Sequence, residues 1–133
     1  MYNMKTCYCH SGEYVSNCCE PFISGKTVPK TALQLMRSRY SAYTLNKIDY
    51  IKSTMTGPAL HKFHLTNREQ KTDSIQWTGL TILSHSEKID NGWVTFIANY
   101  IHNDLPQQLH EKSLFKKVNN KWFYYDGELL DNR

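Results

Sequence analysis

The spacing of apolar residues follows a helical period in the first half of the chain and an extended period in the second. Apolar side chains recur at steps of three and four at Leu33, Met36, Tyr40 and Tyr43. This spacing is typical of one buried helix face. Thr31 and Gln34 have the Thr-x-x-Gln spacing of a capping box, so the helix is predicted to begin after Thr31.

Two more helices are predicted before the strands begin. A short helix around Ile51 is predicted to end at the Gly-Pro pair of residues 57–58. A Thr-x-x-Glu capping box then predicts a third helix over residues 67–75. His61 and His64 fall between these two helices. We interpret them as surface side chains in a loop, because a metal site would need further ligands nearby.

From Trp77 onward the apolar period is two, which predicts four strands. The first strand begins at Trp77, and the others cover residues 93–101, 107–118 and 121–126. Turns are predicted at residues 90–92, where an Asn-Gly pair favours positive φ, and at residues 119–120, an Asn-Asn pair. Helices followed by a meander of strands predict an α+β fold with an antiparallel sheet.

All four cysteines lie within the first twenty residues, in the pattern C-x-C-x8-C-C. Cys7, Cys9, Cys18 and Cys19 can surround one ion tetrahedrally. Structural zinc prefers four thiolates, or three thiolates and an imidazole. His10 adjoins the first pair and is an alternative to one of the thiolates. The sequence therefore predicts one structural Zn²⁺ per chain.

Disulfides are the alternative for these cysteines, since four of them allow three pairings. A bond between Cys18 and Cys19 would be strained, and one between Cys7 and Cys9 would close a very tight ring. The cross-pairings that remain suit a secreted protein. Residues 1–6 are polar, however, and no apolar segment of a secretory signal follows them. We therefore expect thiolates in a reducing compartment, the cytoplasm.

Several runs of the sequence resemble known proteins. Residues 7–13, Cys-Tyr-Cys-His-Ser-Gly-Glu, followed by the second cysteine pair, resemble the SEC-C zinc motif known from the C-terminal tail of the SecA translocase. Four runs are similar, in the same order, to the YchJ family of uncharacterised bacterial proteins: residues 18–25, 35–43, 77–80 and 122–127. Tyr8, His10 and Glu13 replace the proline, glycine and lysine that are usual in SEC-C motifs, so the basic character of that motif is missing.

The YchJ resemblance implies a cystatin-like cone of the nuclear transport factor 2 kind. In that fold a curved antiparallel sheet wraps around an N-terminal helix, and its open end often forms a pocket. We expect a SEC-C-like zinc knuckle over residues 1–25 and an α+β cone domain over residues 26–133. The side chains expected to face the pocket are Arg39, Tyr40, Tyr43, Glu111 and Asp126. His110 adjoins Glu111 on a strand and so points to the opposite face.

Arg39 lies within the apolar arc of the first helix, beside Met36 and Tyr43. An unpaired guanidinium would be costly to bury there. We therefore expect a carboxylate partner, either Glu111 or Asp126. A structural ion pair is one interpretation, and a ligand-anchoring arginine or a catalytic acid–base pair are two others.

The net charge excludes few classes of function. The net charge is +4, and residues 26–71 hold nine basic residues against two acidic ones. We interpret this basic segment as a solvated helical face, since such a balance does not by itself indicate nucleic-acid binding. The chain has no apolar run of about 18 residues that would predict a membrane span.

The leading functional hypothesis is a binding or adaptor domain with structural zinc and a protein partner. No complete catalytic constellation is visible, so enzyme activity is disfavoured. The alternatives are a small-molecule-binding protein or enzyme that uses the cone pocket, and RNA or ribosome contact through residues 26–71. A wide polar cavity behind Tyr43 would favour the pocket, whereas a cone plugged by Trp and Tyr rings would favour the adaptor.

Overall fold

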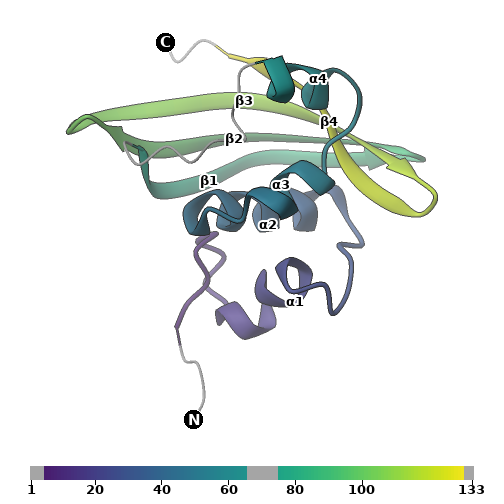
Figure 1. Cartoon of the computed structure of the whole chain (residues 1–133), viewed down its shortest axis with the longest axis horizontal. Helices are drawn as coiled ribbons and strands as arrows, with labels where there is room; N and C mark the ends of the chain where they lie inside the picture. Colours follow the sequence, from purple (N-terminus) through teal and green to yellow (C-terminus); the bar gives the residue numbers. More distant parts are fainter. Residues whose placement is uncertain (1–4, 66–74, 131–133) are drawn as a thin grey trace.

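The computed structural model describes residues 5–65 and 75–130. The helical part comes first, with a 3₁₀ turn η1 (Val15–Asn17) and the helices α1 (Glu20–Ile23), α2 (Ala32–Leu45), α3 (Ile48–Ser53) and α4 (Gly57–Leu65). The strands β1 (Ile75–Lys88), β2 (Asn91–His102), β3 (Leu105–Val118) and β4 (Lys121–Leu129) follow. They form one antiparallel sheet in the order β1-β2-β3-β4 (Figure 1). The predicted α+β fold is confirmed.

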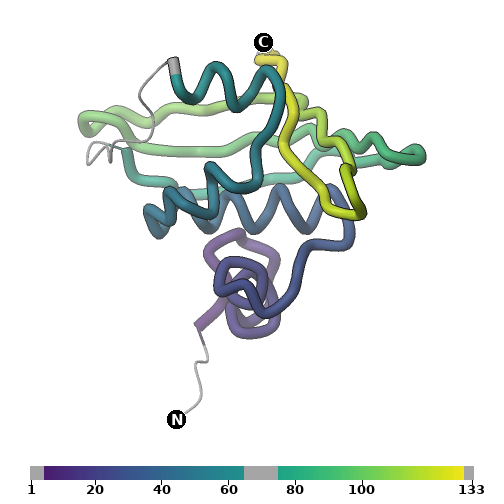
Figure 2. Tube along the Cα trace, turned by 45° about the vertical axis from the view of Figure 1, so that its right-hand side comes forward, coloured from purple at the N-terminus to yellow at the C-terminus, as the bar shows by residue number. Residues whose placement is uncertain are grey.

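Helix α2 lies between the sheet and the cysteine-bearing N-terminal segment (Figure 1, Figure 2). It contacts β1, β2 and β4 as well as α1. The buried cysteines Cys7, Cys9 and Cys19 belong to the same hydrophobic core as Leu35 of α2 and Phe115 of β3. The N-terminal segment and the sheet are therefore joined through one continuous core, with α2 at its centre.

The start of α2 follows the predicted capping box, but its buried surface is wider than the predicted stripe. The Oγ1 atom of Thr31 accepts a hydrogen bond of 3.0 Å from the backbone N–H of Gln34. Leu33 and Tyr43 are only half-buried. The buried residues of α2 are Ala32, Leu35, Met36, Ser38, Arg39, Tyr40, Ser41 and Ala42. Because the sheet, α3 and the N-terminal segment all cover this helix, its small polar residues are buried as well.

Gly92 serves helix packing rather than the first hairpin turn. The β1–β2 hairpin turns at residues 89–90, so the Asn-Gly pair already belongs to β2, and the turn lies earlier than predicted. A Cβ atom on Gly92 would lie 2.6 Å from the Cβ of Ala32, so this glycine allows α2 to approach β2 closely. The turn at residues 119–120 is as predicted, with positive φ at both asparagines.

The segment after the Gly-Pro pair is helical, so the loop interpretation of His61 and His64 is wrong. Both histidines lie on α4. Pro58 occupies the first turn of α4, where its missing N–H is tolerated. The Gly-Pro pair therefore begins α4 as well as following α3. The predicted helix over residues 67–75 falls outside the described residues, except that Ile75 begins β1. Within the described ranges, none of the helices has the length and apolar character needed to span a membrane.

Candidate functional site

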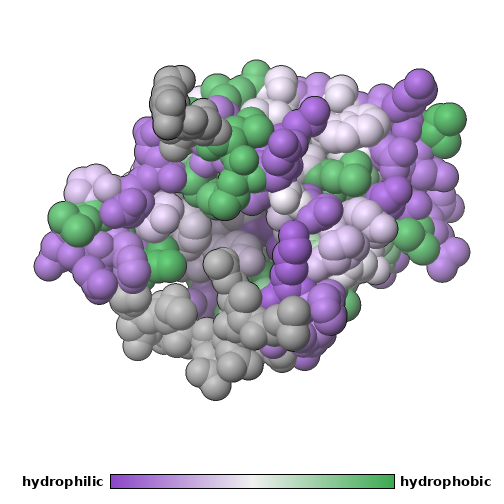
Figure 3. All heavy atoms as spheres, turned by 90° about the horizontal axis from the view of Figure 1, so that it is seen from above, coloured by the Kyte–Doolittle hydropathy of each residue, from purple (hydrophilic) through white to green (hydrophobic). Residues whose placement is uncertain are grey.

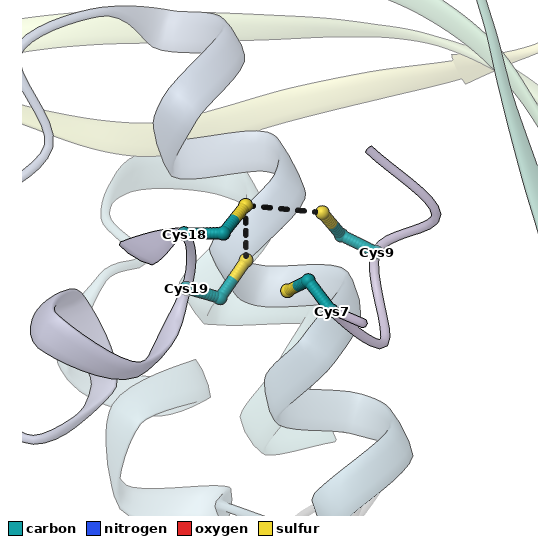
Figure 4. A group of neighbouring side chains, drawn as sticks. All are labelled: Cys7, Cys9, Cys18 and Cys19. Carbon is teal, nitrogen blue, oxygen red and sulfur yellow. Dashed lines mark hydrogen bonds between the residues drawn. The ribbon is translucent and has the colours of Figure 1, made fainter. Parts of the chain in front are cut away.

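The four cysteines converge on one point beside α2. Cys7 and Cys9 come from the N-terminal loop, and Cys18 and Cys19 immediately precede α1 (Figure 4). Their Sγ atoms all lie within 4.8 Å of one another. Cys9 has no exposed surface, and only Cys18 is half-exposed. The spacing in the sequence therefore becomes a compact and nearly closed group of thiols.

The distances between the sulfur atoms fit a tetrahedral metal site. A Zn–S bond of about 2.3 Å places neighbouring sulfurs of a tetrahedron about 3.8 Å apart. The Sγ atoms of Cys9 and Cys18 are 3.6 Å apart, and those of Cys18 and Cys19 are 3.9 Å apart. These separations are far longer than the roughly 2.05 Å of a disulfide bond, and all four cysteines are free. Their donor set matches that of structural zinc.

Polar groups from two other segments contact the thiols. Ser11 Oγ lies 3.2 Å from the Sγ of Cys18, and Ser41 Oγ of α2 lies 3.6 Å from the Sγ of Cys7. Hydroxyl donors in these places suit thiolate ligands, because hydrogen bonds around a metal site orient its ligands. The sequence analysis did not identify either serine. Ser11 could have been found by its place inside the motif, but Ser41 could not.

The electrostatics of the cluster also indicate a cation. Hydrogen bonds from Cys19 and Cys9 hold the pKa of Cys7 far below its ordinary value. Burial raises the pKa of Cys18 to about 11, and the hydrogen bond to Cys7 raises the pKa of Cys19 strongly. The pKa values of Cys7, Cys18 and Cys19 are therefore shifted in opposite directions within one group of sulfur atoms. A divalent cation would supply the positive charge that allows all four to ionise.

His10 lies outside the group of metal-binding atoms. Its backbone has a φ of +63° and its side chain is exposed. Its ring makes an edge contact with Tyr40, with 5.9 Å between the ring centroids. The described geometry therefore favours the set of four thiolates over the set in which His10 replaces one of them.

A second candidate site is a cavity of about 440 Å³ between α2, α4 and the sheet. Its lining contains all five side chains that the sequence analysis expected to face a pocket, namely Arg39, Tyr40, Tyr43, Glu111 and Asp126. Lys62 and Asp126 form an ion pair of 3.4 Å, and their side chains are 67% and 41% exposed, so the cavity reaches the surface. Seen from above, the surface is hollowed near its centre (Figure 3).

Arg39 does not form the expected ion pair. Its Nη1 atom donates hydrogen bonds of 2.7 Å to the carbonyl oxygen of Ile51 and to Oγ1 of Thr54. No carboxylate of the described residues lies within 4.0 Å of the guanidinium. The last turn of α3 leaves carbonyl groups without helical partners, and these accept from Arg39 in place of an acidic side chain. Burial lowers the pKa of Arg39, although an arginine remains protonated.

Glu111 instead accepts hydrogen bonds from two nearby hydroxyl groups. Its Oε2 atom accepts hydrogen bonds of 2.5 Å from Ser113 and 2.7 Å from Tyr124. A Cβ on Gly127 would overlap both the Tyr124 hydroxyl and the Glu111 carboxylate, so only glycine leaves room for this pair. The backbone of residues 54–56 bonds to both the N–H and the carbonyl of Tyr124, and so fixes its position.

Most of the polar residues around Glu111 escaped the sequence analysis. Tyr124 and Gly127 were recognised only as parts of a resemblance. Tyr40 was expected at the pocket and lies in the lining, and its buried hydroxyl has no hydrogen-bond partner in the described part of the chain. Burial raises the pKa of Tyr40 to about 12 and that of Tyr124 still further, while the nearby backbone of Gly79 opposes the shift at Tyr40.

Two solved structures of proteins described as containing a SEC-C motif share this fold. The solution structure of a SEC-C motif-containing protein from Rhodopseudomonas palustris has a TM-score of 0.83 and 35% identity, covering 94% of this chain and 98% of that chain. The crystal structure of a SEC-C motif-containing protein from Psychrobacter arcticus has a TM-score of 0.74 and 28% identity, covering 99% and 86%. The class is therefore an α+β domain with an N-terminal cysteine cluster of the SEC-C kind.

The family follows from the sequence matches. The domain described as "YchJ, middle NTF2-like domain" matches residues 31–127. A UPF0225 protein from Actinobacillus succinogenes is 40% identical over 123 residues, which cover 91% of this chain and 80% of that protein. The chain belongs to the YchJ, or UPF0225, family, as the resemblance in the sequence predicted.

Proposed function

We propose that this chain is a small-molecule-binding protein in which zinc has a structural role. In this proposal the cavity of the NTF2-like domain binds a small organic ligand. Zn²⁺ is held by Cys7, Cys9, Cys18 and Cys19 and fixes the N-terminal segment against α2. A zinc ion with four protein ligands has no open position for a substrate, which supports a structural role rather than a catalytic one.

The observation that carries the proposal is the cavity itself. Its volume of about 440 Å³ falls within the roughly 300–1,000 Å³ typical of small-molecule sites. Tyr43 lies at its wall, and the Trp and Tyr rings do not fill it. A plugged cone would have favoured an adaptor, and the cone is open. The cavity is mainly apolar and not the wide polar one that was expected for a pocket, but an open cavity still supports the pocket hypothesis over the adaptor hypothesis.

The structure weakens the case for RNA contact through residues 26–71. Two arginines of this basic segment point inward, Arg37 to the backbone of Cys9 and Arg39 to α3. Lys62 is paired with Asp126. These side chains are engaged within the protein, which leaves fewer cations for phosphate groups than the sequence suggests.

The remaining parts of the proposal concern organisation and compartment. We assign residues 1–25 to the zinc knuckle and residues 26–133 to the cone domain, because the metal holds together a segment that has few apolar residues of its own. Thiolates that bind zinc require a reducing environment, which supports the cytoplasm as the compartment.

Screening a fragment library against the ¹⁵N-labelled, zinc-loaded chain by NMR tests the pocket. We expect chemical-shift changes to cluster at residues that line the cavity, among them Phe96, Ala98 and Phe115. Ala98→Leu adds volume inside the cavity and should abolish these changes. Thr95→Leu, on the opposite face of the same strand, is the matched control and should preserve them. Binding that survives Ala98→Leu unchanged would show that the cavity is not the site.

A further inference from the structure

The guanidinium of Arg39 is a buried cation with unused hydrogen-bond donors. The residue is 6% exposed and lines the cavity. Both of its hydrogen bonds come from Nη1, to Ile51 and Thr54. Across residues 5–65 and 75–130, neither Nε nor Nη2 donates to a protein acceptor. These donors are not among the fully buried, unpaired polar atoms of the described residues, so they retain accessible surface and can donate to a ligand with suitable acceptors.

Two aromatic rings hold the guanidinium in place. Its Cζ atom lies 4.8 Å from the ring centroid of Tyr124 and 6.0 Å from that of Tyr43. The hydrogen bonds to α3 fix it further. A planar guanidinium that is already ordered recognises a carboxylate through two parallel N–H···O bonds at little entropic cost. Arg39 therefore suits one end of a ligand that carries a carboxylate.

Glu111 presents the opposite charge in the same cavity, beyond the ring of Tyr124. Its Oε2 atom is occupied by the hydroxyls of Ser113 and Tyr124. Its Oε1 atom accepts from no group among the described residues, and the side chain is only partly buried. Tyr124 contacts both side chains, with its ring at Arg39 and its hydroxyl at Glu111, and within the described residues these two charges attract each other without forming an ion pair. Glu111 can accept a hydrogen bond from a charged amine.

The rest of the cavity lining is mainly apolar, and its positively and negatively charged side chains are equal in number. The charged residues of the lining are Arg39, Lys62, Glu111 and Asp126, two of each sign. Apolar side chains fill much of the remaining wall, including Met36, Met55, Phe96, Leu109 and Phe115. A ligand with one net charge gains little from a wall of zero net charge. A ligand that carries both charges and an apolar body matches every part of it.

We propose that the cavity binds a small zwitterion with an apolar body, of the class of an apolar α-amino acid. Its carboxylate lies against Arg39, its ammonium group against Glu111, and its side chain against Phe96 and Phe115. This inference rests on the proposed function of the cavity and gives that function a ligand class.

Matched probes test the need for both charges. L-Phenylalanine, 3-phenylpropionate and phenethylamine share the apolar body and differ in their charged groups, as do L-leucine, 4-methylpentanoate and 3-methylbutylamine. Each is titrated into the zinc-loaded full chain and followed by ¹⁵N NMR at the residues of the lining. We expect at least one amino acid to bind at least tenfold more tightly than both of its single-charge analogues.

Variants assign each charge to its partner. Glu111→Gln should remove the advantage of the amino acid over its carboxylate analogue, whereas Glu128→Gln, which removes an exposed carboxylate outside the lining, should retain it. Arg39→Met should weaken the binding of the carboxylate probes at least tenfold and leave the binding of the amines unaffected. If Arg39→Met fails to fold, as its amide spectrum would show, the wild-type probe series and Glu111→Gln still decide the matter.

The outcomes separate this inference from the proposed function. Equal affinities across a matched series, or amino acids that bind no better than their analogues, would overturn the zwitterion while leaving a functional cavity. If neither these probes nor the fragment library perturbs the lining, both the ligand class and the binding function are wrong.

Discussion

The side chain of Arg37 joins α2 to the cysteine cluster by a hydrogen bond of 3.0 Å from its Nη1 atom to the carbonyl oxygen of Cys9. The same nitrogen lies 3.8 Å from the Sγ of Cys9. A cation in this place balances part of the negative charge that four thiolates leave on a zinc site. Arg37 thus links α2 to the electrostatics of the candidate metal site.

Arg37→Met should weaken zinc binding without abolishing it. Groups that contact the ligands of a metal typically change its affinity by about 10–100-fold when they are removed. Competition with a chromophoric chelator measures this loss. Lys88→Met removes the same charge from the exposed end of β1 and is the control. Equal zinc affinity in the Arg37 variant and the control would show that Arg37 only packs against the N-terminal segment.

Protein purified under reducing conditions should contain about one equivalent of zinc. The reason is the fit of the four Sγ atoms to one tetrahedral ion. Elemental analysis measures the metal, and thiol titration after denaturation counts the cysteines. Cys9→Ser and Cys19→Ser each remove a buried ligand and should lower the metal content sharply. A zinc content near zero together with no titratable thiols would instead establish disulfides.

Chelation of zinc should loosen the first 25 residues and leave the sheet protected. The cysteines hold that segment together, whereas β2 pairs along its whole length with residues 105–116 of β3 and retains apolar core residues such as Val94 and Phe96. Amide hydrogen exchange before and after treatment with a chelator measures the difference. The face of α2 around Ser38 and Ser41 should become partly accessible. Loss of protection throughout the sheet would contradict the division into knuckle and cone, and would make the metal part of the whole core.

Stability should fall between about pH 10 and pH 12 because of Tyr40 and Tyr124. Burial raises the pKa of Tyr40 to about 12, and that of Tyr124 is raised as well, against about 10 in an unfolded chain. The neutral phenols therefore contribute stability that is complete below pH 10 and is lost as the pH rises through the folded-state values. The free energy of unfolding should decrease by about 1 kcal/mol per tyrosine by pH 11.

Chemical denaturation of the zinc-loaded protein at several pH values measures this decrease. Tyr40→Phe should remove the part of this decrease that Tyr40 contributes. It should lower the free energy of unfolding little at pH 7, because the Tyr40 hydroxyl has no hydrogen-bond partner among the described residues. Tyr124→Phe also removes the donor to Glu111 and should destabilise the protein at pH 7. A pH profile of Tyr40→Phe identical to that of the wild type would show that Tyr40 titrates normally.

Local spacing in the sequence was enough to predict the features that depend on neighbours along the chain. The C-x-C-x8-C-C pattern brought the four thiols together, since the loop between the pairs is short. The capping box at Thr31 began α2, and the change of period at Trp77 marked the sheet. The expectation that Glu111 faces the pocket, which came from the family resemblance, is met by its place in the cavity lining.

Packing between distant segments decided the rest. A carboxylate partner, Glu111 or Asp126, was expected for the buried guanidinium of Arg39, but the end of α3 supplies the carbonyl oxygen of Ile51 and the hydroxyl of Thr54 instead. The tertiary structure also uses Gly92 for contact between α2 and β2 and not for a turn. Hydrogen bonds and close approaches of this kind depend on where separate elements meet in space. Residue spacing limits which groups are available, but only the assembled core determines which of them pair.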